Sequence, residues 1–104
     1  MPWGSWINQL PTGFFLTVHV TAFVIAAGFA WTAFRRDLRG LGWAFSLFGA
    51  AEACYMTYHL DWTVFLFAHT ISEVLDLVAF VIVFASAVID VVRVRRPALG
   101  ASSR

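Results

Sequence analysis

Histidine and carboxylate residues occur in this sequence at positions where a membrane protein would normally carry apolar side chains. His19 lies in the first apolar stretch, Glu52 lies in the second, and His69, Glu73 and Asp76 lie in the third. An acidic residue at the centre of a membrane helix costs about 2.5–3.5 kcal/mol on insertion scales. These residues therefore need a partner, a proton or a water-filled cavity, and they are the candidates for a functional site.

Helical spacing places several of these residues together. His69, Glu73 and Asp76 follow an i, i+4, i+7 pattern, which puts them on one face of a helix. With a rise of about 1.5 Å per residue, His19, Glu52 and His69 each lie roughly 10 Å below one membrane boundary, and Glu73 lies about 16 Å below it. We therefore expect one titratable residue from each helix at a common depth, in the half of the protein that contains the N-terminus.

Three kinds of chemistry fit this set of residues. A transition-metal site could use His69, Glu73, Glu52 and His19, because imidazole and carboxylate are common metal ligands. A haem could be held by His19 and His69 as axial ligands from different helices. Carboxylates and imidazoles inside a membrane also form proton or quinone relays. The alternative is that these polar groups only hydrogen-bond across helices or to a larger partner.

The composition predicts an all-α integral membrane protein. Of 104 residues, 61% are hydrophobic and only 12% are charged, whereas soluble domains carry about 25% charged residues. Apolar stretches at about 11–34, 41–59 and 62–92 are each near the length that crosses about 30 Å of hydrocarbon. We expect a single transmembrane domain over 1–96, three helices in an up-down-up antiparallel bundle, and a short disordered cytoplasmic tail over 97–104. Asp61 is expected to cap the third helix, and Pro97 is expected to end it.

The distribution of arginine predicts the orientation in the membrane. All seven basic residues are arginines, and six of them lie within 35–39 and 93–96. These two segments fall on one side of an up-down-up bundle, so the positive-inside tendency predicts an N-terminus outside the cell and a C-terminus inside. Asp90 lies close to Arg93 and Arg95 and is expected to pair with them. The tryptophans agree with this orientation because they fall only at the predicted boundaries: Trp3, Trp6 and Trp62 outside, Trp31 and Trp43 inside.

The short connections leave no room for a soluble catalytic domain. We therefore expect a small accessory or structural subunit of a larger membrane complex, such as an energy-converting or metal-dependent oxidoreductase, that is not catalytic alone. The expected partners are larger membrane subunits and the lipid bilayer, with no nucleic acid, and the expected location is a bacterial cytoplasmic membrane. Two alternatives remain: direct binding of a metal or haem by the histidine and glutamate residues, and a homo-oligomeric ion or proton transporter.

Overall fold

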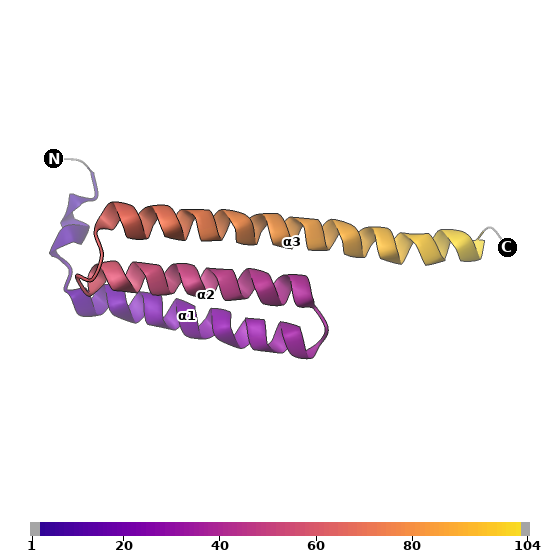
Figure 1. The fold of residues 1–104 in the computed structure, drawn as a ribbon, viewed down its shortest axis with the longest axis horizontal. Helices are drawn as coiled ribbons and strands as arrows, with labels where there is room; N and C mark the ends of the chain where they lie inside the picture. The colour runs from indigo at the N-terminus through magenta and orange to yellow at the C-terminus, as the bar shows by residue number, and fades with distance from the viewer. Residues whose placement is uncertain (1–2, 103–104) are drawn as a thin grey trace.

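The chain folds into helices that run back and forth beside one another (Figure 1). The computed structural model describes residues 3–102, with side chains for residues 3–93, and no strand occurs in this part of the chain. A short 3-10 helix, η1 (Ser5–Gln9), precedes α1 (Thr12–Arg35), α2 (Arg39–His59) and α3 (Phe65–Ser102). The chain reverses direction at both connections between the α-helices. The all-helical class is confirmed, and the bounds of α1 and α2 lie within about two residues of the expected ranges.

Both tight connections contain an aspartate with left-handed backbone. Asp37 has a φ of 60° and Asp61 has a φ of 61°, a region that aspartate tolerates better than bulkier residues. In the second connection the Thr57 and Thr63 hydroxyls lie 3.0 Å apart and are hydrogen-bonded. Because α3 begins only at Phe65, Asp61 belongs to this turn, and the expectation that it caps α3 is wrong.

The third helix is longer than its apolar segment. α3 continues to Ser102, whereas we expected it to end near residue 92 and to be followed by a disordered tail from residue 97. Proline removes one backbone hydrogen bond from a helix, but its fixed φ near −65° is itself helical. The backbone is therefore helical through Pro97 instead of ending there. Figure 1 shows that α3 extends well beyond the other two helices.

The three α-helices form a row with α2 in the middle. α2 packs against both neighbours, while α1 and α3 make no contact with each other within the described residues. Small residues on two sides of α2 explain how it packs closely against both neighbours. Gly42 and Gly49 face Phe34 and Phe23 of α1, whereas Gly40 faces Ser86 of α3. Residues two apart on a helix point in nearly opposite directions, so α2 presents one small-residue face to each neighbour.

The core of this row consists of very small side chains. The buried apolar side chains are all alanines, including Ala44 and Ala68, and the only fully buried side chain larger than alanine among the described residues is that of Ser72. Large side chains such as Phe29, Leu66 and Phe84 are exposed. A soluble protein of this size buries leucine, isoleucine and phenylalanine. The protein therefore presents an apolar surface to its surroundings.

Two of the helices meet the requirements of a membrane span by length and composition. α1 and the Phe65–Arg93 part of α3 are long and apolar enough to cross a bilayer, and few of their residues are buried inside the protein. α2 does not meet the same hydropathy requirement, because glycines and polar residues such as Glu52 are interspersed with its apolar residues. α1 and α3 thus support a membrane location by their length and composition.

Candidate functional site

The end of the row where α1 begins, α2 ends and α3 begins carries the histidines, and we call it the histidine end. Here four rings form a column that alternates between α1 and α2. His59 stacks on Phe15 with ring centroids 4.8 Å apart, His19 on His59 at 5.1 Å, and Tyr55 on His19 at 5.2 Å. Phe15 and His19 are one helical turn apart, as are Tyr55 and His59, so the antiparallel helices interleave their rings.

An ion pair closes the inner end of this column. Nδ1 of His19 lies 2.5 Å from Oε2 of Glu52, and both side chains are largely covered, with exposed fractions of 17% and 27%. The contact joins α1 to α2, and it confirms the expectation that these two residues lie at the same depth. A carboxylate at Nδ1 fixes the orientation of the imidazole and leaves Nε2 to interact with other groups.

Polar contacts also connect α2 to α3 near the same end. The Tyr55 hydroxyl donates to Oε1 of Glu73 at 3.4 Å, a long hydrogen bond. The Ser72 hydroxyl, fully buried, donates to the carbonyl of Ala51 at 2.9 Å. All the side-chain hydrogen bonds that join two α-helices within the described residues therefore lie between the histidine end and the middle of the row.

A cavity of about 430 Å³ lies beside the ring column. Its walls come from η1, α1, α2 and the start of α3, and they include His19, His59, Tyr55 and Tyr58 together with the carboxylate of Asp61. This volume falls within the range of about 300–1,000 Å³ that is typical of small-molecule sites. The cavity thus places two imidazoles and two phenols around a space that could hold a small ligand.

The side chains that line this cavity can form hydrogen bonds with a ligand. His19 lines the cavity, whereas its partner Glu52 does not. The stacked rings of His19 and His59 are tilted by only 28°, so their nitrogens lie in nearly parallel planes.

The residues expected to form one site are only partly brought together. His19 and Glu52 are in contact, and Glu73 reaches the pair indirectly through Tyr55. His69 instead stacks on Phe65 of its own helix, with centroids 5.2 Å apart. Because α1 and α3 do not touch, α2 separates His69 from His19. Within the described residues, no three histidine, cysteine, aspartate or glutamate side chains gather closely enough to hold a metal ion. The metal and haem sites remain predictions.

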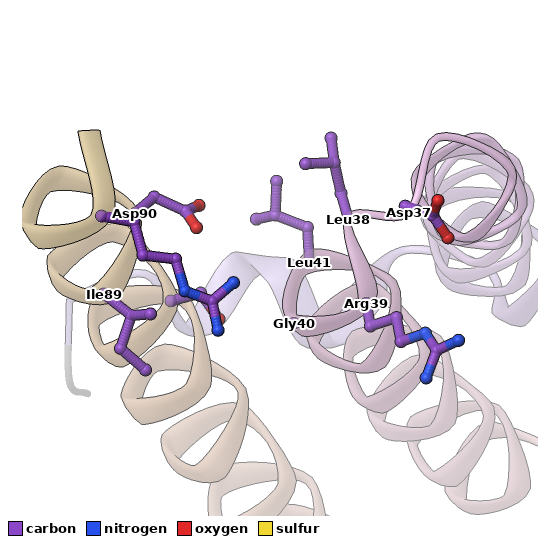
Figure 2. A pocket seen from close by; sticks show the side chains of 9 residues that line it. Asp37, Leu38, Arg39, Gly40, Leu41, Ile89 and Asp90 are labelled. Carbon is purple, nitrogen blue, oxygen red and sulfur yellow. The ribbon is translucent and has the colours of Figure 1, made fainter. Parts of the chain in front are cut away.

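The opposite end, where α1 ends and α2 begins, carries the arginines, and we call it the arginine end. A second cavity, of about 310 Å³, lies there between α2 and α3 (Figure 2). Its ionisable residues are two carboxylates and two guanidinium groups, so their charges balance: Asp37, Asp90, Arg39 and Arg93. Figure 2 shows Arg39 directed away from α3.

Asp90 was expected to pair with Arg93 and Arg95 at this end, and the structure describes the side chain of only the first of these arginines. The predicted pair between Asp90 and Arg93 is not formed, since the one ion pair among the described side chains is that of His19 and Glu52. The Arg95 side chain lies outside the described residues. Among the described side chains, those that line the arginine-end cavity carry no net charge and form no ion pair.

Sequence reasoning missed most of the aromatic part of the site. Phe15, Tyr58 and Phe65 all line the histidine-end cavity, and none of them was a candidate. The signal that could have found Phe15 is its i, i+4 spacing to His19, which repeats in Tyr55 and His59 on the antiparallel helix. Two matched pairs of rings on neighbouring helices favour an interleaved column.

Comparison of the chain with protein-family models, with curated proteins and with solved structures gives no match.

Proposed function

We propose that this protein is a small accessory subunit that lies in a cell membrane as three spanning helices and packs against a larger membrane protein through α3. The single observation that carries this proposal is the position of Glu73. Its side chain is exposed on α3, inside the segment that is apolar enough to span a bilayer. An acidic group at such a position needs to be covered by something other than lipid.

Insertion of the whole row follows from how the helices pack. α1 and the Phe65–Arg93 segment of α3 meet the requirements of membrane spans. α2 lies between them and packs on both, so it cannot stay in water while its neighbours cross the bilayer. Its polar side chains are consistent with this position, because Glu52 is paired with His19 and Ser46 donates to the carbonyl of Gly42 at 2.8 Å. Satisfied polar groups are what a membrane interior requires.

The depth of Glu73 supports a protein partner. Glu73 lies two turns after Phe65, the first residue of α3, which corresponds to roughly 12 Å along the helix. The long hydrogen bond from Tyr55 is its only hydrogen bond within the described residues. Leaving an acidic group at this depth against lipid costs about 2.5–3.5 kcal/mol. A partner helix that donates hydrogen bonds to Glu73, or carries a basic residue opposite it, would remove this cost.

The same face of α3 carries His69 and Leu77, each one turn from Glu73, and both are exposed. An apolar helix face with two ionisable groups at one end matches the usual interfaces between membrane helices, where polar residues add hydrogen bonds to close packing. The N-terminus is proposed to lie outside and the arginine end inside, because the arginines gather at that end of the row.

Site-specific photo-crosslinking in intact membranes tests the proposal. A benzophenone side chain is placed at Leu77, on the Glu73 face, and in a separate variant at Val24, which is 61% exposed on α1. We expect Leu77 to crosslink to one larger membrane protein in high yield and Val24 to give only lipid adducts. The crosslink from Leu77 should weaken when Glu73→Lys is added. The lysine would place a positive charge opposite the hydrogen-bond donors, or the basic residue, with which the partner is proposed to meet Glu73.

Two results would overturn the proposal. The first is an equal pattern of crosslinks from Leu77 and Val24, which would mean that α3 has no special partner. The second is a Leu77 crosslink to another copy of this chain, which would favour a homo-oligomer that shields Glu73 by itself.

A further inference from the structure

We infer that a groove between α1 and α2, which runs toward the arginine end, binds an anionic phospholipid. One acyl chain of the lipid lies in the groove, and its phosphate is held by Arg35 and Arg39. The inference rests on the part of the proposed function that places α1 and α2 in a bilayer, but it does not involve the partner of α3. It is carried by the apolar groove, by two tryptophans at its outer end and by the two arginines beyond them.

The groove is lined almost entirely by apolar side chains. It has a volume of about 320 Å³, and its walls include Ala27, Trp31 and Phe34 of α1 and Ser46 of α2. The Ser46 hydroxyl already donates to the carbonyl of Gly42 at 2.8 Å, so it makes no demand on a ligand. Lipid tails are as apolar as these walls. In a bilayer, therefore, an acyl chain fills the groove.

Two tryptophans mark the membrane boundary at the outer end of the groove. Trp31 and Trp43 are 67% and 60% exposed, and exposed tryptophans gather at the level of the lipid headgroups. Arg35 follows Trp31 by four residues in α1. Arg39 precedes Trp43 by four residues in α2. Four residues rise about 6 Å and each headgroup layer is roughly 5–7 Å thick, so both arginines lie at the level of the lipid phosphates.

Helical spacing puts both arginines on the face that carries the groove. Arg35 lies one turn beyond Trp31, and Trp31 lines the groove. Arg39 lies two turns before Ser46, and Ser46 lines the groove from the other helix. Figure 2 agrees with this placement, because it shows Arg39 directed away from α3. The two guanidinium groups thus come from neighbouring helices to one end of the same groove.

The charges at this end favour an anionic headgroup. Six arginines but only two aspartates, Asp37 and Asp90, belong to the arginine end. Both aspartates line the cavity between α2 and α3, and neither lines the groove between α1 and α2. Among the described side chains, neither Arg35 nor Arg39 forms an ion pair. Arginine donates paired hydrogen bonds to phosphate, and basic residues beside a membrane span attract anionic lipids.

Co-purification of lipids tests the inference on the purified protein. The protein is incubated in dodecyl maltoside micelles that hold equal amounts of phosphatidylglycerol and phosphatidylcholine with the same acyl chains, and it is then moved into lipid-free micelles. Mass spectrometry quantifies the lipids that remain bound, with protein-free resin as the blank. We expect at least tenfold more phosphatidylglycerol than phosphatidylcholine, because each arginine near a membrane surface raises the affinity for anionic lipid several-fold.

Two double variants locate the headgroup. Arg35→Gln with Arg39→Gln should bring the ratio of the two lipids close to one. Arg36→Gln with Arg93→Gln removes the same charge and should keep the preference. Arg36 follows Phe29 by seven residues, and Phe29 lines a separate groove, whereas Arg93 lies on α3, which does not contact α1 within the described residues. Equal loss in both double variants would overturn the inference, because the lipid would then respond only to overall positive charge.

A third variant tests the acyl chain. Ala27 is exposed and lines the groove, so Ala27→Phe should fill the groove without disturbing the core and should lower the retained phosphatidylglycerol several-fold. Excess inorganic phosphate at constant ionic strength should leave the retained lipid unchanged.

Three further results would each overturn the inference. The first is equal retention of the two lipids by the natural protein. The second is full retention of phosphatidylglycerol by Ala27→Phe, and the third is its displacement by inorganic phosphate, since either would indicate a site for an anion without an acyl chain. None of these results alters the Leu77 crosslink, which reports on α3, so this inference and the proposed function fail separately.

Discussion

The two ends of the helical row are held together in different ways. At the histidine end the helices are joined by an ion pair, a column of stacked rings and a hydrogen bond between side chains. At the arginine end they are joined by close approach of small residues, with Gly42 against Phe34 and Gly40 against Ser86. Helix packing at the arginine end therefore depends on the close fit of small residues. Helix packing at the histidine end depends on specific pairs of polar and aromatic side chains.

This difference favours the histidine end as the location of a functional site. Close packing of glycine on a neighbouring side chain needs no ionisable group, and it is a common way to bring membrane helices together. Ionisable groups inside an apolar segment are costly and are usually retained for a use. The histidine end has both an accessible cavity and an ion pair, while the cavity at the arginine end has balanced charges and no ion pair among the described side chains.

The largest expected loss of stability comes from a variant that disrupts helix packing at the arginine end. Replacing Gly40 by leucine places a Cβ 2.9 Å from Cβ of Ser86, an atom too close to the backbone to swing away, so α2 and α3 must separate. We expect a loss of about 3 kcal/mol in the free energy of unfolding, the upper part of the usual range for overpacking. Unfolding in mixed dodecyl sulfate and dodecyl maltoside, followed by circular dichroism, measures it.

Gly28→Leu is the matched control for that variant. Gly28 lies in α1 and nothing lies within 4 Å of a Cβ added there, so its stability should change by less than about 0.5 kcal/mol. Equal losses for both variants would show that leucine perturbs either helix regardless of packing, and that the arginine end is not held by shape.

A smaller effect is expected at the histidine end. Glu52→Ala removes the partner of a largely covered imidazole, and we expect a loss of about 2 kcal/mol, since an unsatisfied buried polar group costs about 1–3 kcal/mol. Glu52→Gln should lose less because an amide oxygen still accepts from Nδ1 of His19. The same unfolding experiment reports both values.

Asp37→Asn provides the comparison at the other end. Asparagine tolerates the left-handed backbone at this position as aspartate does, and Asp37 is exposed and has no ion pair among the described side chains, so removal of its charge should cost less than about 0.5 kcal/mol. A loss for Asp37→Asn as large as that for Glu52→Ala would remove the contrast between the two ends.

The sequence was most informative about the helices and the depth of single residues. Runs of apolar residues predicted α1 and α2 closely, and counting the helical rise from one boundary correctly matched His19 with Glu52. The sequence could not predict which helices pack against each other. Periodicity shows which residues share a face, but the separation of α1 from α3 depends on glycines at positions 40, 42 and 49 that place small faces on two sides of α2.

Two errors have the same physical origin. Asp61 and Pro97 were read as helix boundaries because these residue types often occur there. In the structure, the connection contains a left-handed Asp61 and a hydrogen bond between two threonines, and these delay the start of α3 to Phe65. Local preference alone does not determine where a long helix begins or ends.

The most direct test of membrane insertion is the accessibility of the two ends from outside the cell. In a Cys54→Ser background, one variant carries Ser5→Cys in η1 at the histidine end, and another carries Asp37→Cys at the arginine end. Both are exposed to a membrane-impermeant maleimide in intact cells and again after permeabilisation. We expect Ser5→Cys to react in intact cells and Asp37→Cys to react only after permeabilisation. Reaction of both positions in intact cells, or of Asp37→Cys alone, would contradict a row of three spanning helices with the histidine end outside.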